Sequence, residues 1–203
     1  SPSYGQIAVT DTDSTREYTY KVFDSTVDAL LKVRDSLVLV NLEAAVAAIC
    51  AAGRVEFYGF GASAAVAFDA QHKFFRLQIT SAAYSDPHLQ NMSATSLNAG
   101  DVVIAISQSG RSQALLDSMD LVKQAGGLVI GLAPSGSPVA LRASIPIEVD
   151  AKEDIQIYTP LSSRIAHLAV IDVLAIGIAQ RKGPKLHEHL QQLQAGLSSL
   201  RSQ

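Results

Sequence analysis

The sequence predicts an α/β protein in which a five-stranded parallel sheet is covered by helices on both faces, a three-layer doubly wound arrangement. Short β-branched runs alternate with segments of helical periodicity about five times along the chain. Hydrophobic residues make up 48% of the chain and charged residues 17%, which suits a sheet that is buried on both sides. A chain of 203 residues is long enough to form one such domain.

The N-terminal part of the chain is predicted to divide into an arm and the start of the domain. Residues 1–22 are rich in Thr, Asp and Ser and have no clear period, so we predict a linker or extended arm that connects to a further domain. The compact domain is expected to cover residues 23–203. Asp24 or Ser25 can cap one long helix with an apolar face, and Gly53 is expected to end it.

The later elements follow from the same patterns. Asp86 and Pro87 provide a cap and a first helical residue, and Gly183 with Pro184 separates two C-terminal helices. The predicted strands are 54–60, 77–82, 102–106, 128–133 and 145–149, and the predicted helices after the first are 62–75, from 87, 113–125, 138–142, 160–179 and from 184.

The turn after the third predicted strand carries the strongest chemical signal. Ser107, Ser109 and Ser112 surround a turn between a buried strand and a helix start. The first N–H groups of a helix lack intrahelical partners and the helix dipole is positive there, so this turn is suited to an anion. A single capping serine would satisfy the helix end, and the turn has no Lys of a nucleotide P-loop. We therefore predict a pocket for a phosphate monoester on a small molecule.

A second turn, Gly59-Phe60-Gly61-Ala62-Ser63, follows the first predicted strand. Glycine allows close approach of the backbone to a ligand, and Gly61 and Ser63 are candidate ligand contacts. The third glycine of the dinucleotide fingerprint is absent, since position 64 is Ala, so a nicotinamide cofactor is not expected. A tight structural turn explains the pattern about equally well. If both turns bind ligand, they should meet at the carboxyl edge of the sheet.

Composition excludes several other functions. The formal net charge of −3 lacks the basic footprint of a nucleic-acid-binding domain. A single cysteine, Cys50, rules out a disulfide framework and favours a reducing cytoplasm. No apolar run reaches the roughly 18 residues that span a bilayer, so no membrane association is expected. No catalytic residue, metal ligand set or cofactor is predicted, because the histidines are scattered.

The two turns together resemble those of a SIS (sugar isomerase) domain, a phosphosugar-binding module of flavodoxin-like fold. Tyr158-Thr159-Pro160-Leu161-Ser162-Ser163-Arg164-Ile165-Ala166 and the apolar helix after it narrow the resemblance to the RpiR-like transcriptional regulators, specifically those of hexose catabolism. The resemblance covers residues from about Phe23 to the end. It implies an absent N-terminal helix-turn-helix domain that binds operator DNA, while this domain senses 2-keto-3-deoxy-6-phosphogluconate, a phosphorylated sugar acid.

The resemblance also implies roles for individual residues. Ser63 and Ser107 would hold the ligand, Ser109 and Ser112 would contact its phosphate, and Gln108 would be a neighbour of the site. The residues themselves add further candidates near the start of the penultimate helix. Ser162 and Ser163 are expected near the other end of the ligand, and Arg164 could bind a carboxylate in a bidentate manner. A structural ion pair for Arg164 is about as well supported.

An enzyme remains an alternative, because SIS domains also occur in aldose–ketose isomerases. Isomerisation requires a base near the carbonyl group, and Glu153 after the fifth predicted strand is the candidate. An acid in the run Ala151-Lys152-Glu153-Asp154 is more often a solvated loop charge. We therefore expect a sensor and not an enzyme.

The C-terminal helix indicates a homodimer. Leu186, Leu190, Leu193, Leu197 and Leu200 follow the spacing of a coiled-coil seam over only two heptads. Such a stripe packs on its own domain or on a partner subunit. Because a two-fold operator requires a two-fold protein, we predict that this helix and the helix over 23–52 help to form a dimer, and packing on the same domain stays open.

Overall fold

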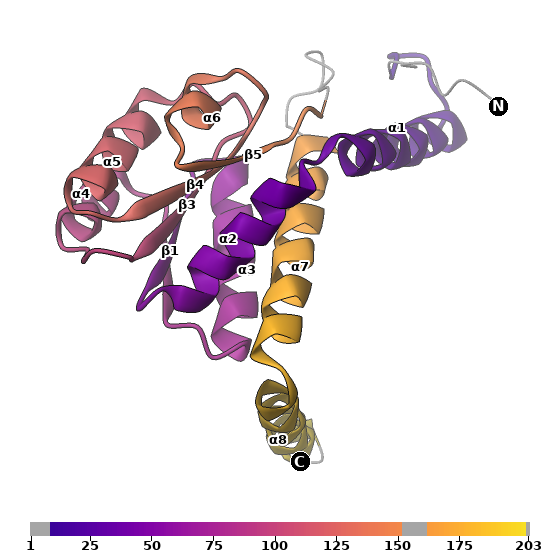
Figure 1. Ribbon diagram of the computed structural model, residues 1–203. Coiled ribbons are helices and arrows are strands. Elements are labelled where there is room, and N and C mark those ends of the chain that lie inside the picture. Colours follow the sequence, from indigo (N-terminus) through magenta and orange to yellow (C-terminus); the bar gives the residue numbers. More distant parts are fainter. Residues whose placement is uncertain (1–8, 152–161, 202–203) are drawn as a thin grey trace.

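The computed structural model of the protein describes residues 9–151 and 162–201 (Figure 1). Within these ranges the helices are α1 (Thr15–Ser36), α2 (Leu39–Ala51), α3 (Ala62–Arg76), α4 (Pro87–Thr95), α5 (Gln113–Gln124), α6 (Pro138–Arg142), α7 (Ser162–Lys182) and α8 (Pro184–Arg201). The strands are β1 (Val55–Tyr58), β2 (Ser81–Tyr84), β3 (Val102–Ile106), β4 (Leu128–Ala133) and β5 (Ile145–Glu148).

The strands form one parallel sheet in the order β2-β1-β3-β4-β5, which confirms the doubly wound, flavodoxin-like prediction. The chain moves outward from β1 to β2 and then returns to the other side of β1 to form β3. The order therefore reverses between β1 and β3, whose paired residues include Tyr58 and Ala105. Ligands of such sheets bind beyond the carboxyl ends of the strands at this point.

Helices cover both faces of the sheet, as Figure 1 shows. On one face α2, α3 and α7 enclose the larger core, which includes Phe57, Phe74 and Ile104. On the other face α4, α5 and α6 enclose a smaller core around Tyr58 and Met119. Strand β3 is buried at every position, which explains its continuous β-branched run.

The N-terminal helices differ from the prediction in two ways. The expected single helix is interrupted at Leu37 and Val38, whose backbones are extended, so α1 and α2 are separate helices. The expected arm is already helical from Thr15. Ser14 begins this helix with a capping box, in which its hydroxyl oxygen accepts a hydrogen bond from the Glu17 amide and its own amide donates to the Glu17 carboxylate.

The second strand also differs from the prediction, because β2 begins at Ser81 and not at Leu77. Leu77 and Ile79 are buried in the core, but they belong to the connection after α3. Gln78 between them has φ +58°, in the left-handed region, which does not fit a strand.

The C-terminal helices combine core packing with exposed apolar surface. Among the described residues, α7 alone is long and apolar enough to cross a membrane, and its buried residues pack in the core of the domain. Along α8 the leucines become progressively more exposed, from 3% at Leu186 to 72% at Leu200. The first turns of α8 therefore pack more closely on their own domain than its last turns do.

Candidate functional site

The first turn of the site joins β1 to α3 and depends on two glycines. Gly61 precedes the helix with φ +55°, a backbone conformation that favours glycine. A Cβ on Gly59 would lie 2.6 Å from the Ser63 carbonyl oxygen, so the turn can close onto the helix start only without a side chain there. The Ser63 amide donates to the Phe60 carbonyl oxygen at 3.0 Å, and the Ser63 side chain is buried in the first turn of α3.

The second turn joins β3 to α5. The Ser107 amide donates to the Leu132 carbonyl oxygen at 3.0 Å and so extends the pairing of β3 with β4 into the turn. Each of the three serine hydroxyl oxygens accepts a hydrogen bond from a nearby backbone N–H: Ser107 from Gly110 at 2.8 Å, Ser109 from Arg111 at 3.2 Å and Ser112 from Leu115 at 3.4 Å.

These bonds occupy only the acceptor side of the three hydroxyls. A serine hydroxyl has one proton to donate in addition to its lone pairs. Within residues 9–151 and 162–201, no acceptor is found for the protons of Ser107, Ser109 or Ser112. The turn can therefore donate three hydroxyl hydrogen bonds next to the starts of α3 and α5, where the helix dipoles favour negative charge.

The two turns enclose one cavity of about 340 Å³. The predicted residues Gly61, Ser63, Ser107, Gln108, Ser109 and Ser112 all line it, together with Phe60, Ala62, Ile106 and Leu115. The apolar members were not recognised from the sequence, since each fits the pattern of a buried strand or helix. Their position directly beside the two turns was the available signal. The cavity thus combines an apolar wall with hydroxyl and amide groups.

The serine turn is fixed in place by its contact with the start of α6. Gly110 has φ +67°, and a Cβ there would lie 2.1 Å from Ser137 Oγ. The Val139 amide donates to the Gly110 carbonyl oxygen at 3.0 Å. The backbone of the turn is therefore held by tertiary packing before any ligand binds.

The remaining candidates lie apart from this cavity or outside the described residues. Ser162 and Ser163 are buried in the first turn of α7, and Arg164 next to them is half-buried. None of the three lines the cavity between the two turns. Glu153 lies outside the described residues, so its contact with ligand stays a prediction.

The described lining of the cavity consists of hydroxyl, amide and apolar groups. None of its described members is a carboxylate, imidazole or amine. The described residues also contain no group of three His, Cys, Asp or Glu side chains placed to hold a metal ion. A charged group of a ligand would be held there by neutral donors and helix dipoles.

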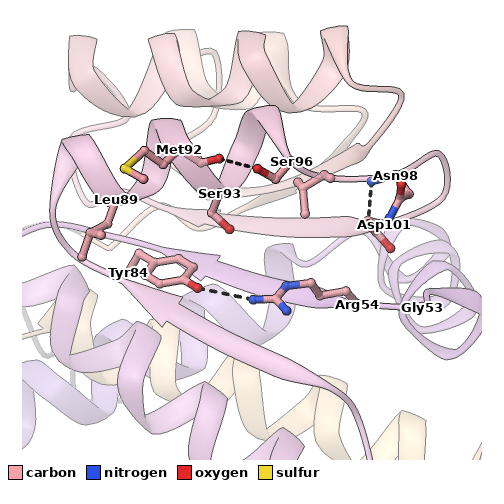
Figure 2. Close-up of a pocket in the computed structure, with 10 residues that line it drawn as sticks. Gly53, Arg54, Tyr84, Leu89, Met92, Ser93, Ser96, Asn98 and Asp101 are labelled. Atoms are coloured by element: carbon pink, nitrogen blue, oxygen red, sulfur yellow. Dashed lines mark hydrogen bonds between the residues drawn. The ribbon is translucent and has the colours of Figure 1, made fainter.

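A second cavity of about 600 Å³ lies between α4 and the amino ends of β1 and β3. Figure 2 shows Arg54 extended between the sheet and α4, with its guanidinium group hydrogen-bonded to the Tyr84 hydroxyl at 3.3 Å. Leu89 and Met92 on α4 line the same cavity (Figure 2). Asp101 accepts a hydrogen bond from the Asn98 amide at 2.8 Å and lines the far end.

Beneath this cavity lies a buried carboxylate that was not recognised from the sequence. Glu56 is fully buried and accepts hydrogen bonds from Arg54 Nε at 2.7 Å, the Tyr58 hydroxyl at 2.8 Å and Ser93 Oγ at 2.7 Å. Burial, with the Glu56 charge as a second cause, raises the pKa of the Tyr58 hydroxyl. The hydrogen bond to Glu56 raises the pKa of the Arg54 guanidinium. The Tyr58 hydroxyl and the Arg54 guanidinium therefore stay protonated, and the hydrogen bonds to Glu56 connect α4 to β1.

Comparison with known proteins assigns a family to this fold. The SIS domain family matches residues 48–177. The transcriptional regulator HexR of Escherichia coli K12 is 39% identical over 193 residues, which cover 95% of this chain and 67% of that protein. HexR of Pseudomonas aeruginosa is 37% identical over 190 residues, with 94% and 67% covered. The bifunctional protein glk of Paraburkholderia xenovorans is 42% identical over 180 residues, which cover 89% of this chain but only 28% of that protein.

Solved structures agree on the architecture. The Vibrio vulnificus NanR protein complexed with ManNAc-6P superposes with a TM-score of 0.84 at 21% identity, covering 92% of this chain and 70% of that one. The sugar isomerase domain of an RpiR transcription factor from Sphaerobacter thermophilus gives a TM-score of 0.79 at 23% identity, covering 87% and 98%. At these identities the likeness establishes the fold. The chain belongs to the SIS domain family, within which it is related to the HexR transcriptional regulators over almost its whole length.

Proposed function

We propose that this chain is the effector-sensing domain of a transcriptional regulator of hexose catabolism, and that it binds a phosphorylated sugar acid between its two turns. The single observation that carries the proposal is the cavity lined by Ser63, Ser107, Ser109 and Ser112 at the carboxyl edge of β1 and β3. The preferred effector is 2-keto-3-deoxy-6-phosphogluconate, which the resemblance to regulators of hexose catabolism implies. The NanR protein, a relative in fold, is complexed with the phosphosugar ManNAc-6P in its structure, which supports this ligand class.

In this proposal the phosphate group lies at the start of α5. There it accepts hydrogen bonds from the hydroxyl groups of Ser107, Ser109 and Ser112. The oxygen of each hydroxyl also accepts a hydrogen bond from a backbone amide. Ser63 and Gln108 contact the rest of the sugar acid, and Gly61 allows its close approach. Ser162, Ser163 and Arg164 are candidates for the carboxylate end, and Glu153 stays a further candidate contact.

Operator DNA is bound, in this proposal, by a helix-turn-helix domain that lies outside this chain, in a cytoplasmic homodimer. The HexR relatives are helix-turn-helix regulators of which the chain spans about two thirds. A ligand that binds one arrangement of the dimer better shifts the population toward it. A coupling free energy of about 1–3 kcal/mol changes operator affinity roughly 5- to 150-fold.

Calorimetric titration of the chain with phosphorylated sugars and sugar acids tests the effector. We expect saturable binding of 2-keto-3-deoxy-6-phosphogluconate and a loss of about tenfold or more in affinity for Ser107→Ala and for Ser63→Ala, since a hydrogen bond to a charged group contributes about 1.5–3 kcal/mol. Ser96→Ala, at the end of α4, is the matched control and should leave affinity unchanged. If neither Ser107→Ala nor Ser63→Ala lowers the affinity, the proposed site is contradicted.

The same samples separate the sensor from the isomerase. The sensor predicts binding without turnover of ketose and aldose phosphates, because no described lining residue is a proton-transferring group. Turnover that is lost in Glu153→Gln would assign the chain to the isomerases instead.

A further inference from the structure

The cavity of about 600 Å³ beside α4 is lined by two side chains of opposite charge that do not pair with each other. The Arg54 guanidinium forms its ion pair with Glu56, at 2.7 Å, and Asp101 has no ion pair with any described residue. In Figure 2 Asp101 lies at one end of the cavity and Leu89 at the other, with Arg54 between them. A molecule that carries both charges could therefore pair with each of the two groups.

Asp101 is only 6% exposed, yet one of its carboxylate oxygens is unused. Oδ2 accepts a hydrogen bond from the Asn98 amide at 2.8 Å, which holds the turn before β3. Within residues 9–151 and 162–201, no group donates a hydrogen bond to Oδ1. Buried carboxylate oxygens are usually satisfied. Oδ1 is not sealed off by protein atoms, so a donor in the cavity can reach it.

The sheet side of the same cavity provides unused donors. Arg54 donates from Nε to Glu56 at 2.7 Å and from Nη2 to the Tyr84 hydroxyl at 3.3 Å. A guanidinium group has five N–H bonds, so Nη1 and the second N–H of Nη2 have no acceptor among the described residues. The proton of the Tyr84 hydroxyl also has none there. A guanidinium fork beside a hydroxyl proton fits a carboxylate group.

Charge and polarity narrow the ligand class. Glu56 offsets the charge of Arg54, so Asp101 leaves the surroundings of the cavity negative. An anion alone would be repelled, and an amine alone would leave the donors on the sheet side unused. Leu89 and Met92 on α4 add an apolar wall and are 49% and 55% exposed. The lining therefore fits a zwitterion with an apolar side chain.

We propose that this cavity binds a small zwitterion of the class of the apolar α-amino acids. Its ammonium group donates to Asp101 Oδ1, its carboxylate accepts from Arg54 and the Tyr84 hydroxyl, and its side chain packs on Leu89 and Met92. The volume of the cavity lies in the range of small-molecule sites. The inference is independent of the proposed sugar-phosphate site, which is a separate cavity at the other end of the sheet.

Calorimetric titration of the whole chain with L-leucine, L-methionine and L-phenylalanine tests the proposal. We expect saturable binding of at least one of the three. Isopentylamine and isocaproate are leucine without its carboxylate and without its amino group. Each should bind about tenfold or more weakly than leucine, because each lacks one of the two charge-assisted contacts.

Two variants locate the binding. Asp101→Asn should lower the affinity for the amino acid about tenfold or more but should not weaken isocaproate, because only the ammonium contact is lost. Tyr84→Phe leaves the turn before β3 intact and should lower the amino-acid affinity about threefold or more. Glu43→Gln, an exposed acid on α2 across the sheet, is the matched control and should bind like the wild type.

Three results would overturn the proposal: a wild type that binds none of the three amino acids, isocaproate that binds as well as leucine, or Asp101→Asn and Tyr84→Phe that both bind like the wild type. Thermal unfolding checks that each variant is folded. Titration of the same samples with 2-keto-3-deoxy-6-phosphogluconate keeps the two proposals apart. Sugar-phosphate binding should be unchanged in Asp101→Asn, and its absence from the wild type would reject the proposed effector alone.

Discussion

The hydroxyl of Ser107 accepts a hydrogen bond from the Gly110 amide and keeps its own proton for another group. The same division applies to Ser109 and Ser112, each of which accepts from a backbone amide. A capping serine and a ligand-binding serine are therefore compatible, because the two roles use different sides of one oxygen. Among the described residues, the capping bonds leave the donor side of each hydroxyl unused.

Gly110→Ala is expected to disturb the serine turn on the side that contacts Ser137. Its Cβ would lie 2.1 Å from Ser137 Oγ, on a residue that already has φ +67°. We expect a loss of about 1–3 kcal/mol in the free energy of unfolding and weaker sugar-phosphate binding. Chemical denaturation and calorimetric titration measure the two effects.

Gly136→Ala is the matched control, since Gly136 also has positive φ, of +69°, but its Cβ would meet no atom within 4 Å. It should show only the backbone strain and keep the affinity of the wild type. Equal binding losses in both variants would mean that contact between the serine turn and Ser137 does not matter for the ligand.

At this scale the sequence predicted the polar half of the cavity and missed the apolar half. Gly61, Ser63 and Ser107 were identifiable because small and hydroxyl residues at a strand end have few structural explanations. Phe60 and Leu115 have many such explanations, since a large apolar residue beside a strand usually belongs to a core. Only the fold shows that their side chains line the cavity.

At the scale of elements, the predicted bounds of helices and strands were wrong where apolar periodicity does not determine the backbone conformation. Val33 on α1 and Leu42 on α2 enter the same core, so the apolar period continues through the break at Leu37 and Val38. No Gly or Pro marks that break. The buried Leu77 and Ile79 likewise suggested a strand, although they only connect α3 to β2. The short strands β3 and β4 were predictable because their β-branched runs end at clear turns.

The start of α1 was also recoverable from the sequence, because Ser14 and Glu17 have the spacing of a capping box. Ser14→Ala is expected to fray the first turns of α1, since the Glu17 amide loses its acceptor. Amide hydrogen exchange should increase at the start of α1 and remain unchanged in the sheet. Hydrogen bonds from the Ser14 amide and hydroxyl hold the pKa of Glu17 below its ordinary value, so the variant should raise it. A Glu17 titration identical to that of the wild type would contradict this account.

At the scale of the whole molecule, the two cavities lie at different ends of the sheet and have different consequences. The cavity at the carboxyl ends is lined by serine hydroxyl groups. The cavity beside α4 covers the satisfied Glu56 network, in which each carboxylate oxygen has a partner. The proposed sugar-phosphate site is therefore the first cavity, whereas the second covers the contacts that attach α4 to the sheet.

Glu56→Gln tests whether the second cavity has a structural role that is separate from sugar-phosphate binding. The variant weakens hydrogen bonds of a buried charge to Arg54 and Tyr58, so we expect a loss of about 1–3 kcal/mol in the free energy of unfolding. Arg54 is partly exposed, which keeps the loss below that of a fully buried ion pair. Sugar-phosphate affinity should be unchanged when titrated well below the unfolding transition. A stable variant with impaired binding would instead connect the second cavity to ligand recognition.

If the proposed phosphate site is correct, the serine turn should also make ligand affinity sensitive to pH, although none of the serines ionises. The second proton of a phosphate monoester has a pKa of about 6. The serine hydroxyls have protons to donate, and the helix dipoles at the turn favour negative charge, so both interactions are stronger with the doubly ionised ester. The singly protonated ester should therefore bind poorly. We expect the affinity for the phosphate ester to rise up to about tenfold per pH unit below pH 6 and to level off above pH 7. This change should parallel the titration of the ester, measured by its ³¹P chemical shift. The ionisation of the metabolite itself would then set the response of the domain to pH.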